Sequence, residues 1–101
     1  MTLPNLSRYM YIPSNKKIYN LITMEYVNIY VSENEEYCYL IDNYNIKKKN
    51  YIKQIAELDF EIFYERIHEQ QYGKCDAYKP IPITEQLMDY YYSKTIPDLY
   101  L

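Results

Sequence analysis

The sequence of residues 48–73, KKNYIKQIAELDFEIFYERIHEQQYG, decides the fold class, because its apolar residues recur with the period of a helix. At 100° per residue, one side of the helix collects Ile52, Ile55, Ala56, Ile62, Phe63 and Ile67. Gln54 and His68 fall on the opposite side, together with Glu57, Glu61 and Glu65. Gly73, the only glycine of the chain, stands where a left-handed C-terminal cap belongs. The pattern predicts a long amphipathic helix over about residues 48–72.

The charges of this segment leave a second interpretation open. Lysines gather at its start and glutamates toward its end, which is opposite to the preference of the helix dipole. Phe60, Ile62 and Tyr64 also alternate with their neighbours, as side chains of a strand do. A helix that ends near Leu58, followed by a strand over residues 60–67, is therefore the alternative.

Upstream of the helix, residues 8–41 have the pattern of β-strands. Residues 8–12 and 17–22 are β-rich and are separated by the turn formers Pro13-Ser14-Asn15, which predicts a hairpin. Residues 25–31 alternate apolar and polar side chains and form the clearest strand signal in the chain.

A fourth strand is expected over residues 37–41, ending at the turn-like residues 42–45. Short polar connections suit antiparallel neighbours, so the segment predicts an antiparallel meander of about four strands.

Downstream, Pro80 and Pro82 favour an extended segment, and Thr84 is suited to begin a short C-terminal helix over about residues 84–94. The whole chain, residues 1–101, is expected to form a single α+β domain with both helices packed on one sheet face.

Composition narrows the class of protein. The chain has 49% hydrophobic and 25% charged residues, which is typical of a globular protein, and its net charge of −3 disfavours direct nucleic-acid binding. No apolar run is long enough for a membrane span, and no signal peptide is apparent, so we expect a cytoplasmic protein. Cys38 and Cys75 are isolated and are expected to be reduced; a single disulfide in a secreted product is the alternative.

Catalytic and metal-binding patterns find little support. His68 is the only histidine, with Glu65 and Glu69 close to it in sequence, but no recognisable nucleophile motif accompanies it. One histidine and two separated cysteines do not make a zinc site, and one glycine cannot build a phosphate-binding loop. We expect no enzymatic activity, no cofactor and no metal.

Four glutamates at four-residue spacing are the most specific feature of the sequence: Glu57, Glu61, Glu65 and Glu69. On a helix they form one stripe with neighbours roughly 6 Å apart along the axis. Such like-charge spacing destabilises an isolated helix by a few tenths of a kcal/mol per pair. The stripe predicts either an ordinary solvated face or a ridge that meets a basic surface on another protein.

The chain contains 16 tyrosines, against 2 phenylalanines and no tryptophan. Tyr, Ile, Asn and Lys all have AU-rich codons, so a low-GC genome, such as that of many phages, accounts for the number without selection for function. Position is more informative, since Tyr26 and Tyr30 lie opposite the apolar side of the strand over residues 25–31. They are expected either on an exposed, partner-binding sheet face or in cross-strand packing.

A basic set provides the nucleic-acid alternative: Lys47, Lys48, Lys49, Lys53, Arg66 and His68. The order Ile18-Tyr19, then residues 25–30, then a lysine-rich helix, then Phe63 and Arg66-Ile67-His68 resembles the LytTR-type DNA-binding domain of bacterial response regulators. That resemblance implies a β-rich fold that reads DNA from loops. Glu69 and Gln70 stand where the family usually has a basic residue and a serine.

The sequence therefore favours a small non-catalytic protein-binding module, of the kind a phage or mobile element uses as an inhibitor. Its expected partner is a protein with a basic, nucleic-acid-binding surface, bound through the glutamates and exposed tyrosines. A homodimer is compatible with the same features. The alternative is a DNA-binding transcriptional regulator that uses the basic set.

Overall fold

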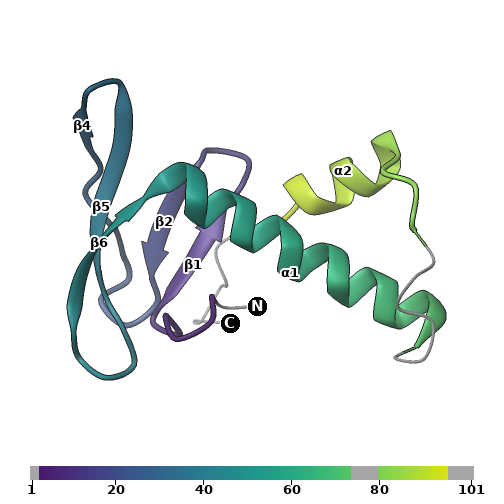
Figure 1. The fold of residues 1–101 in the computed structure, drawn as a ribbon, viewed down its shortest axis with the longest axis horizontal. Coiled ribbons are helices and arrows are strands. Elements are labelled where there is room, and N and C mark those ends of the chain that lie inside the picture. Colours follow the sequence, from purple (N-terminus) through teal and green to yellow (C-terminus); the bar gives the residue numbers. More distant parts are fainter. Residues whose placement is uncertain (1–2, 74–79, 96–101) are drawn as a thin grey trace.

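Six strands and two helices make up the part of the chain that the computed structural model describes, residues 3–73 and 80–95 (Figure 1). They are β1 (Tyr9–Ile12), β2 (Lys17–Asn20), β3 (Glu25–Tyr26), β4 (Tyr30–Ser32), β5 (Glu35–Ile41), β6 (Lys47–Tyr51), α1 (Ile52–Tyr72) and α2 (Glu85–Tyr92). The predicted α+β class is confirmed. The single meander of about four strands is wrong in detail, because the strands form two antiparallel sheets, β1-β2-β3 and β4-β5-β6.

The predicted first hairpin is confirmed. Strand β1 pairs with β2 from Tyr9 opposite Asn20 to Ile12 opposite Lys17. In the turn, the Asn15 side chain accepts a hydrogen bond from the Lys17 N–H, and the backbone of Lys16 is left-handed, with φ of 57°. The local turn chemistry recognised in the sequence therefore sets this register.

The strand expected over residues 25–31 is interrupted, which corrects the clearest strand prediction. Val27 and Ile29 turn inward against the core as the alternation predicts, but they belong to no strand, and Val31 is 69% exposed. The chain changes sheets here: the Val27 N–H donates to the Ile18 carbonyl of β2, whereas Tyr30 already pairs with Tyr37 of β5. The interruption therefore lies where the chain passes from the first sheet to the second.

The long helix begins at Ile52, so the predicted start near Lys48 is wrong. Residues 47–51 form β6, which pairs with β5 from Ile41 opposite Lys47 to Tyr37 opposite Tyr51. The turn before it is stabilised by Asp42, whose side chain accepts hydrogen bonds from the Tyr44 and Ile46 N–H groups. Pairing of these residues with β5 outweighs the helical tendency of the lysines.

Helix α1 is continuous to Tyr72, so the alternative strand over residues 60–67 is also wrong. Phe60 and Phe63 both pack on Tyr91 of α2, with ring centroids 5.2 and 4.9 Å apart. Such aromatic pairs contribute about 0.5–1.5 kcal/mol each, more than the few tenths lost per like-charge pair. Gly73 caps the helix at the predicted position, and its N–H donates to the Glu69 carbonyl. Its φ of 70° is positive as expected, but its ψ of −173° lies outside the left-handed helical region.

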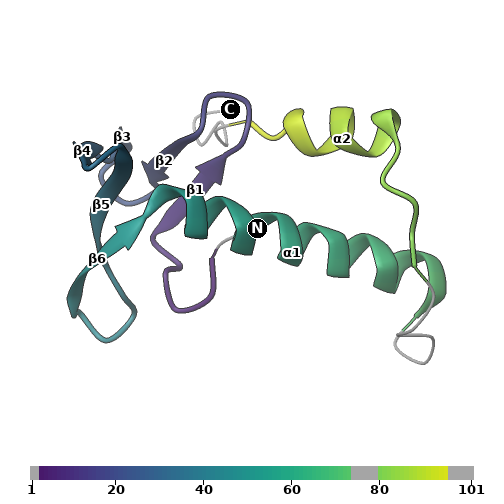
Figure 2. The ribbon, with the colours of Figure 1, turned by 45° about the horizontal axis from the view of Figure 1, so that its top comes forward.

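Helix α2 returns alongside α1 toward the β1-β2 hairpin (Figures 1 and 2). It covers residues 85–92, slightly less than the predicted 84–94, and Thr84 caps it by accepting a hydrogen bond from the Leu87 N–H. The segment before it is fixed to α1, since the Ile81 N–H donates to the Tyr64 hydroxyl at 2.8 Å.

The main core lies where the two sheets meet α1. Its buried members are Leu3, Tyr9, Tyr11, Ile18, Cys38, Leu40, Ile52 and Ile55. The Tyr9 hydroxyl accepts a hydrogen bond from the Ile41 N–H at 3.0 Å, which ties the first sheet to the second. Among the described residues, no helix has the length and apolar character needed to cross a lipid bilayer.

Candidate functional site

The four glutamates form the exposed stripe that their spacing predicts. Glu57, Glu61, Glu65 and Glu69 all lie on α1 and are all exposed. Within the described part of the chain, no ion pair joins Glu57, Glu61 or Glu65 to a cation. We call these four residues the glutamate stripe; the charges of Glu57, Glu61 and Glu65 are available to a partner.

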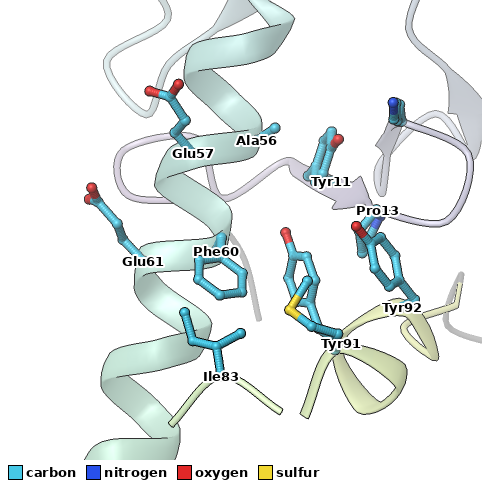
Figure 3. A pocket seen from close by; sticks show the side chains of 11 residues that line it. Tyr11, Pro13, Ala56, Glu57, Phe60, Glu61, Ile83, Tyr91 and Tyr92 are labelled. Atoms are coloured by element: carbon cyan, nitrogen blue, oxygen red, sulfur yellow. The ribbon is translucent and has the colours of Figure 1, made fainter. Parts of the chain in front are cut away.

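A shallow groove lies beside the first half of the stripe, and the sequence alone gave no indication of it. The groove has a volume of about 610 Å³ and lies between α1, α2 and the β1-β2 hairpin. Its lining includes Tyr11, Pro13, Lys16, Ala56, Glu57, Phe60, Glu61, Ile83, Met88, Tyr91 and Tyr92. Figure 3 shows Glu57 and Glu61 along one side, with Phe60 between them and the tyrosines of the other side. Apolar and aromatic area therefore adjoins two exposed carboxylates.

The wall formed by α2 is held by a buried carboxylate, Asp59, which is 2% exposed. Its side chain accepts a hydrogen bond from the Tyr91 hydroxyl at 2.8 Å and forms a 2.8 Å ion pair with Lys94. Burial first, and the hydrogen bond to Asp59 second, raise the pKa of Tyr91 well above its usual range. Asp59 is a positioning residue that fixes α2 against α1.

Sequence reasoning missed Asp59, although a signal was present. Asp59 lies four residues after Ile55 and four before Phe63, both of which are buried on α1. A carboxylate at a core position of a helix needs a buried partner. That periodicity would have predicted a buried interaction but not its partners, which are 32 and 35 residues away.

Tyr26 and Tyr30 are exposed, as the first of the two interpretations expects, but they belong to different sheets. Tyr26 is 44% exposed on β3 and packs against Tyr19, with ring centroids 5.4 Å apart. Tyr30 is 46% exposed on β4 and contacts Tyr37 and Tyr39 of β5 at 5.7 and 6.2 Å. The two tyrosines therefore belong to separate groups of contacting rings, and both also take part in cross-strand packing.

Around Tyr30, rings and cations alternate on the exposed face of the second sheet. Lys49 lies 4.3 Å from the Tyr37 ring centroid, and Lys47 lies 5.6 Å from that of Tyr39. We call this surface the tyrosine–lysine face; it consists of Tyr30, Tyr37, Tyr39, Lys47, Lys49 and Tyr51. A hydrogen bond with Tyr51 raises the pKa of Lys49.

The basic set proposed for DNA is divided between two parts of the molecule. Lys47, Lys48 and Lys49 lie on β6, and Lys53 lies in the first turn of α1. Arg66 and His68 lie in the second half of α1, so that Lys53 and Arg66 are separated by about 20 Å of helix. The structure therefore does not bring the set together as one surface.

His68 and Cys38, which carry acid–base and thiol chemistry, are both at least partly buried. His68 is half-buried between the rings of Tyr64 and Tyr72. Cys38 is a free, buried thiol, and burial raises its pKa to about 11. Cys75 lies outside the described residues. No three His, Cys, Asp or Glu side chains of residues 3–73 and 80–95 are grouped so that they could hold a metal ion.

Comparisons with protein-family models, with curated proteins and with solved structures find no match. The LytTR-type resemblance therefore depends on the short segments that suggested it. Arg66-Ile67-His68 lies within α1, whereas the resemblance implies that DNA is read from loops. The arrangement of the side chains is thus the main guide to function.

Proposed function

We propose that this protein is a small non-catalytic binding module that occludes a basic, nucleic-acid-binding surface of another protein. The glutamate stripe and the adjoining groove form its contact surface. In this proposal it acts in the cytoplasm as an inhibitor of the kind encoded by phages and mobile elements.

One observation carries the proposal: Glu57 and Glu61 belong both to the glutamate stripe and to the lining of the groove. A row of glutamates alone would be an ordinary solvated helix face. Here the row runs beside exposed apolar area, since Ile83 in the groove is 60% exposed. Charge next to an aromatic depression is typical of surfaces that bind proteins.

The groove suits a long basic side chain of the partner. An arginine or lysine buries its aliphatic stem on apolar surface while its charged end stays in water or meets an acid. Phe60 and Tyr92, which is 48% exposed, offer ring surface for the stem, and Glu57 and Glu61 offer carboxylates for the charged end. Burial of such an anchor supplies affinity, and the remaining glutamates mainly accelerate association.

The DNA-binding alternative lacks comparable support. Its basic residues lie at separate places. Arg66 and His68 share α1 with the glutamate stripe, whose charge repels phosphate. Lys47 and Lys49 of β6 belong to a different surface, the tyrosine–lysine face.

Replacing all four glutamates of the stripe with glutamine tests the proposal. We expect the variant to keep its fold, with stability unchanged or raised by up to about 1 kcal/mol, because like-charge pairs at four-residue spacing are removed. Capture of protein from nuclease-treated host lysate should fall at least about tenfold, corresponding to 1.4 kcal/mol.

The matched control removes the same number of negative charges from another part of the surface. In it, glutamine replaces Glu25, Glu33, Glu35 and Glu36. All four are exposed and lie on or between the strands. The control variant should capture the same protein as wild type. Equal capture by the stripe variant, with its circular dichroism unchanged, would refute the role of the glutamate stripe.

A further inference from the structure

The second sheet presents one buried and one open face, and its open face is aromatic. Cys38 and Leu40 of β5 are fully buried in the core with α1, so strand alternation places Tyr37 and Tyr39 on the opposite face. Tyr39 is 44% exposed and contacts the rings of Tyr37 and Tyr30 at 5.9 and 6.2 Å. Mutual contact holds these rings in place, and Tyr30 and Tyr39 are both nearly half exposed.

The same face carries positive charge although the whole chain is acidic. Lys47 and Lys49 of β6 lie across from Ile41 and Tyr39 of β5 and reach over the rings. Lys47 and Lys49 lie on β6, at the end of Figure 1 where α1 begins, whereas the stripe runs along that helix from Glu57 onward. Strand alternation places Glu35 on the open face, which marks its acidic border.

Rings interleaved with cations favour a ligand that is both flat and anionic. Nucleobases stack on tyrosine rings irrespective of sequence, while lysines contact the phosphates. A duplex hides its base faces in its own stack, so this chemistry selects a single strand. Lysines on an edge strand also discourage edge-to-edge aggregation, but that role does not require tyrosines on the same face.

We propose that the tyrosine–lysine face is a second binding site, which takes single-stranded nucleic acid through stacking on its tyrosines and phosphate contacts with its lysines. This site uses other residues than the glutamate stripe and does not depend on the proposed function above.

Fluorescence anisotropy of a labelled oligothymidylate, measured with the full chain, tests the site. We expect saturable binding that weakens between about 50 and 200 mM salt and that exceeds binding of a duplex of the same length. Tyr39→Ala should weaken binding about fivefold or more, because one stacking partner is lost. Lys49→Ala should lower the magnitude of the salt slope by about 0.7. Glu35→Gln should strengthen binding.

Tyr26→Ala and Lys17→Ala are the matched controls, because Lys17 lies 5.2 Å from the Tyr26 ring centroid on the first sheet. Both should bind the oligonucleotide within twofold of wild type. The proposal is overturned if the oligonucleotide does not bind at low salt, if folded Tyr39→Ala binds as wild type does, or if the duplex binds equally well. Competition by polyglutamate as effective as that by unlabelled oligothymidylate would also overturn it, in favour of an acidic protein ligand.

Discussion

Cys38 shows how position in the fold sets the chemistry of a single side chain. The residue is 0% exposed on the inner face of β5, and burial alone raises the pKa of its thiol from 9.0 to about 11. A thiol reacts as its thiolate. Cys38 is therefore protected from thiol reagents, because they cannot reach the buried sulfur and because the sulfur stays protonated. The sequence expectation of a reduced cysteine agrees with a free thiol at this position.

In a Cys75→Ser variant, we expect the Cys38 thiol to resist Ellman's reagent at pH 8 until denaturant unfolds the protein. The folded state keeps the Cys38 proton to about pH 11, whereas the unfolded state loses it near pH 9. The thiol therefore contributes stability that is complete below pH 9 and is lost as the pH rises toward 11. Urea unfolding at several pH values, compared with a Cys38→Ala variant, measures that loss. Rapid stoichiometric labelling of the folded protein at pH 8 would contradict this account.

Among the elements, the pairing of α1 with α2 decides whether the groove exists. Asp59 on α1 accepts a hydrogen bond from Tyr91 of α2 and forms an ion pair with Lys94, which follows that helix. The Lys94 side chain is only 14% exposed. A buried carboxylate left without its cation is costly, although the Tyr91 hydrogen bond would remain. The ion pair therefore controls the position of α2.

We expect Lys94→Ala to lower the free energy of unfolding by about 2–4 kcal/mol, because it leaves a buried charge unpaired. The double variant Asp59→Asn/Lys94→Met removes both charges and should be more stable than Lys94→Ala. Urea unfolding followed by circular dichroism measures both. If Lys94→Ala is as stable as wild type, the ion pair does not hold α2.

Local patterns predicted the elements whose causes are local. The β1-β2 hairpin follows from its turn residues, and the end of α1 follows from Gly73. The error at residues 48–51 has a distant cause, since Asn50 pairs with Cys38 across the second sheet. The order of residues within this lysine-rich segment does not indicate that pairing.

The candidate sites divide in the same way. Exposure of the glutamate stripe follows from helical spacing alone and was predictable. The groove was not, because Phe60 and Tyr91 come together only through the packing of α2 on α1. The tyrosine–lysine face also required the register of β5 with β6, which places Lys49 opposite Tyr39.

Two exposed surfaces of the molecule carry opposite charge, although the net charge of the chain is only −3. Lysines occupy β6 at the start of α1, and glutamates occupy the exposed side of that helix. A protein organised in this way can hold a basic partner and an anionic strand at different places. The two surfaces should therefore respond independently to mutation.

The most direct test measures both ligands on the same two variants: protein captured from nuclease-treated lysate, and anisotropy of the labelled oligothymidylate. We expect the four-glutamine stripe variant to lose the captured protein and to keep binding the oligonucleotide. Tyr39→Ala should keep the captured protein and bind the oligonucleotide more weakly. A folded stripe variant that still captures the protein as wild type does would contradict the account.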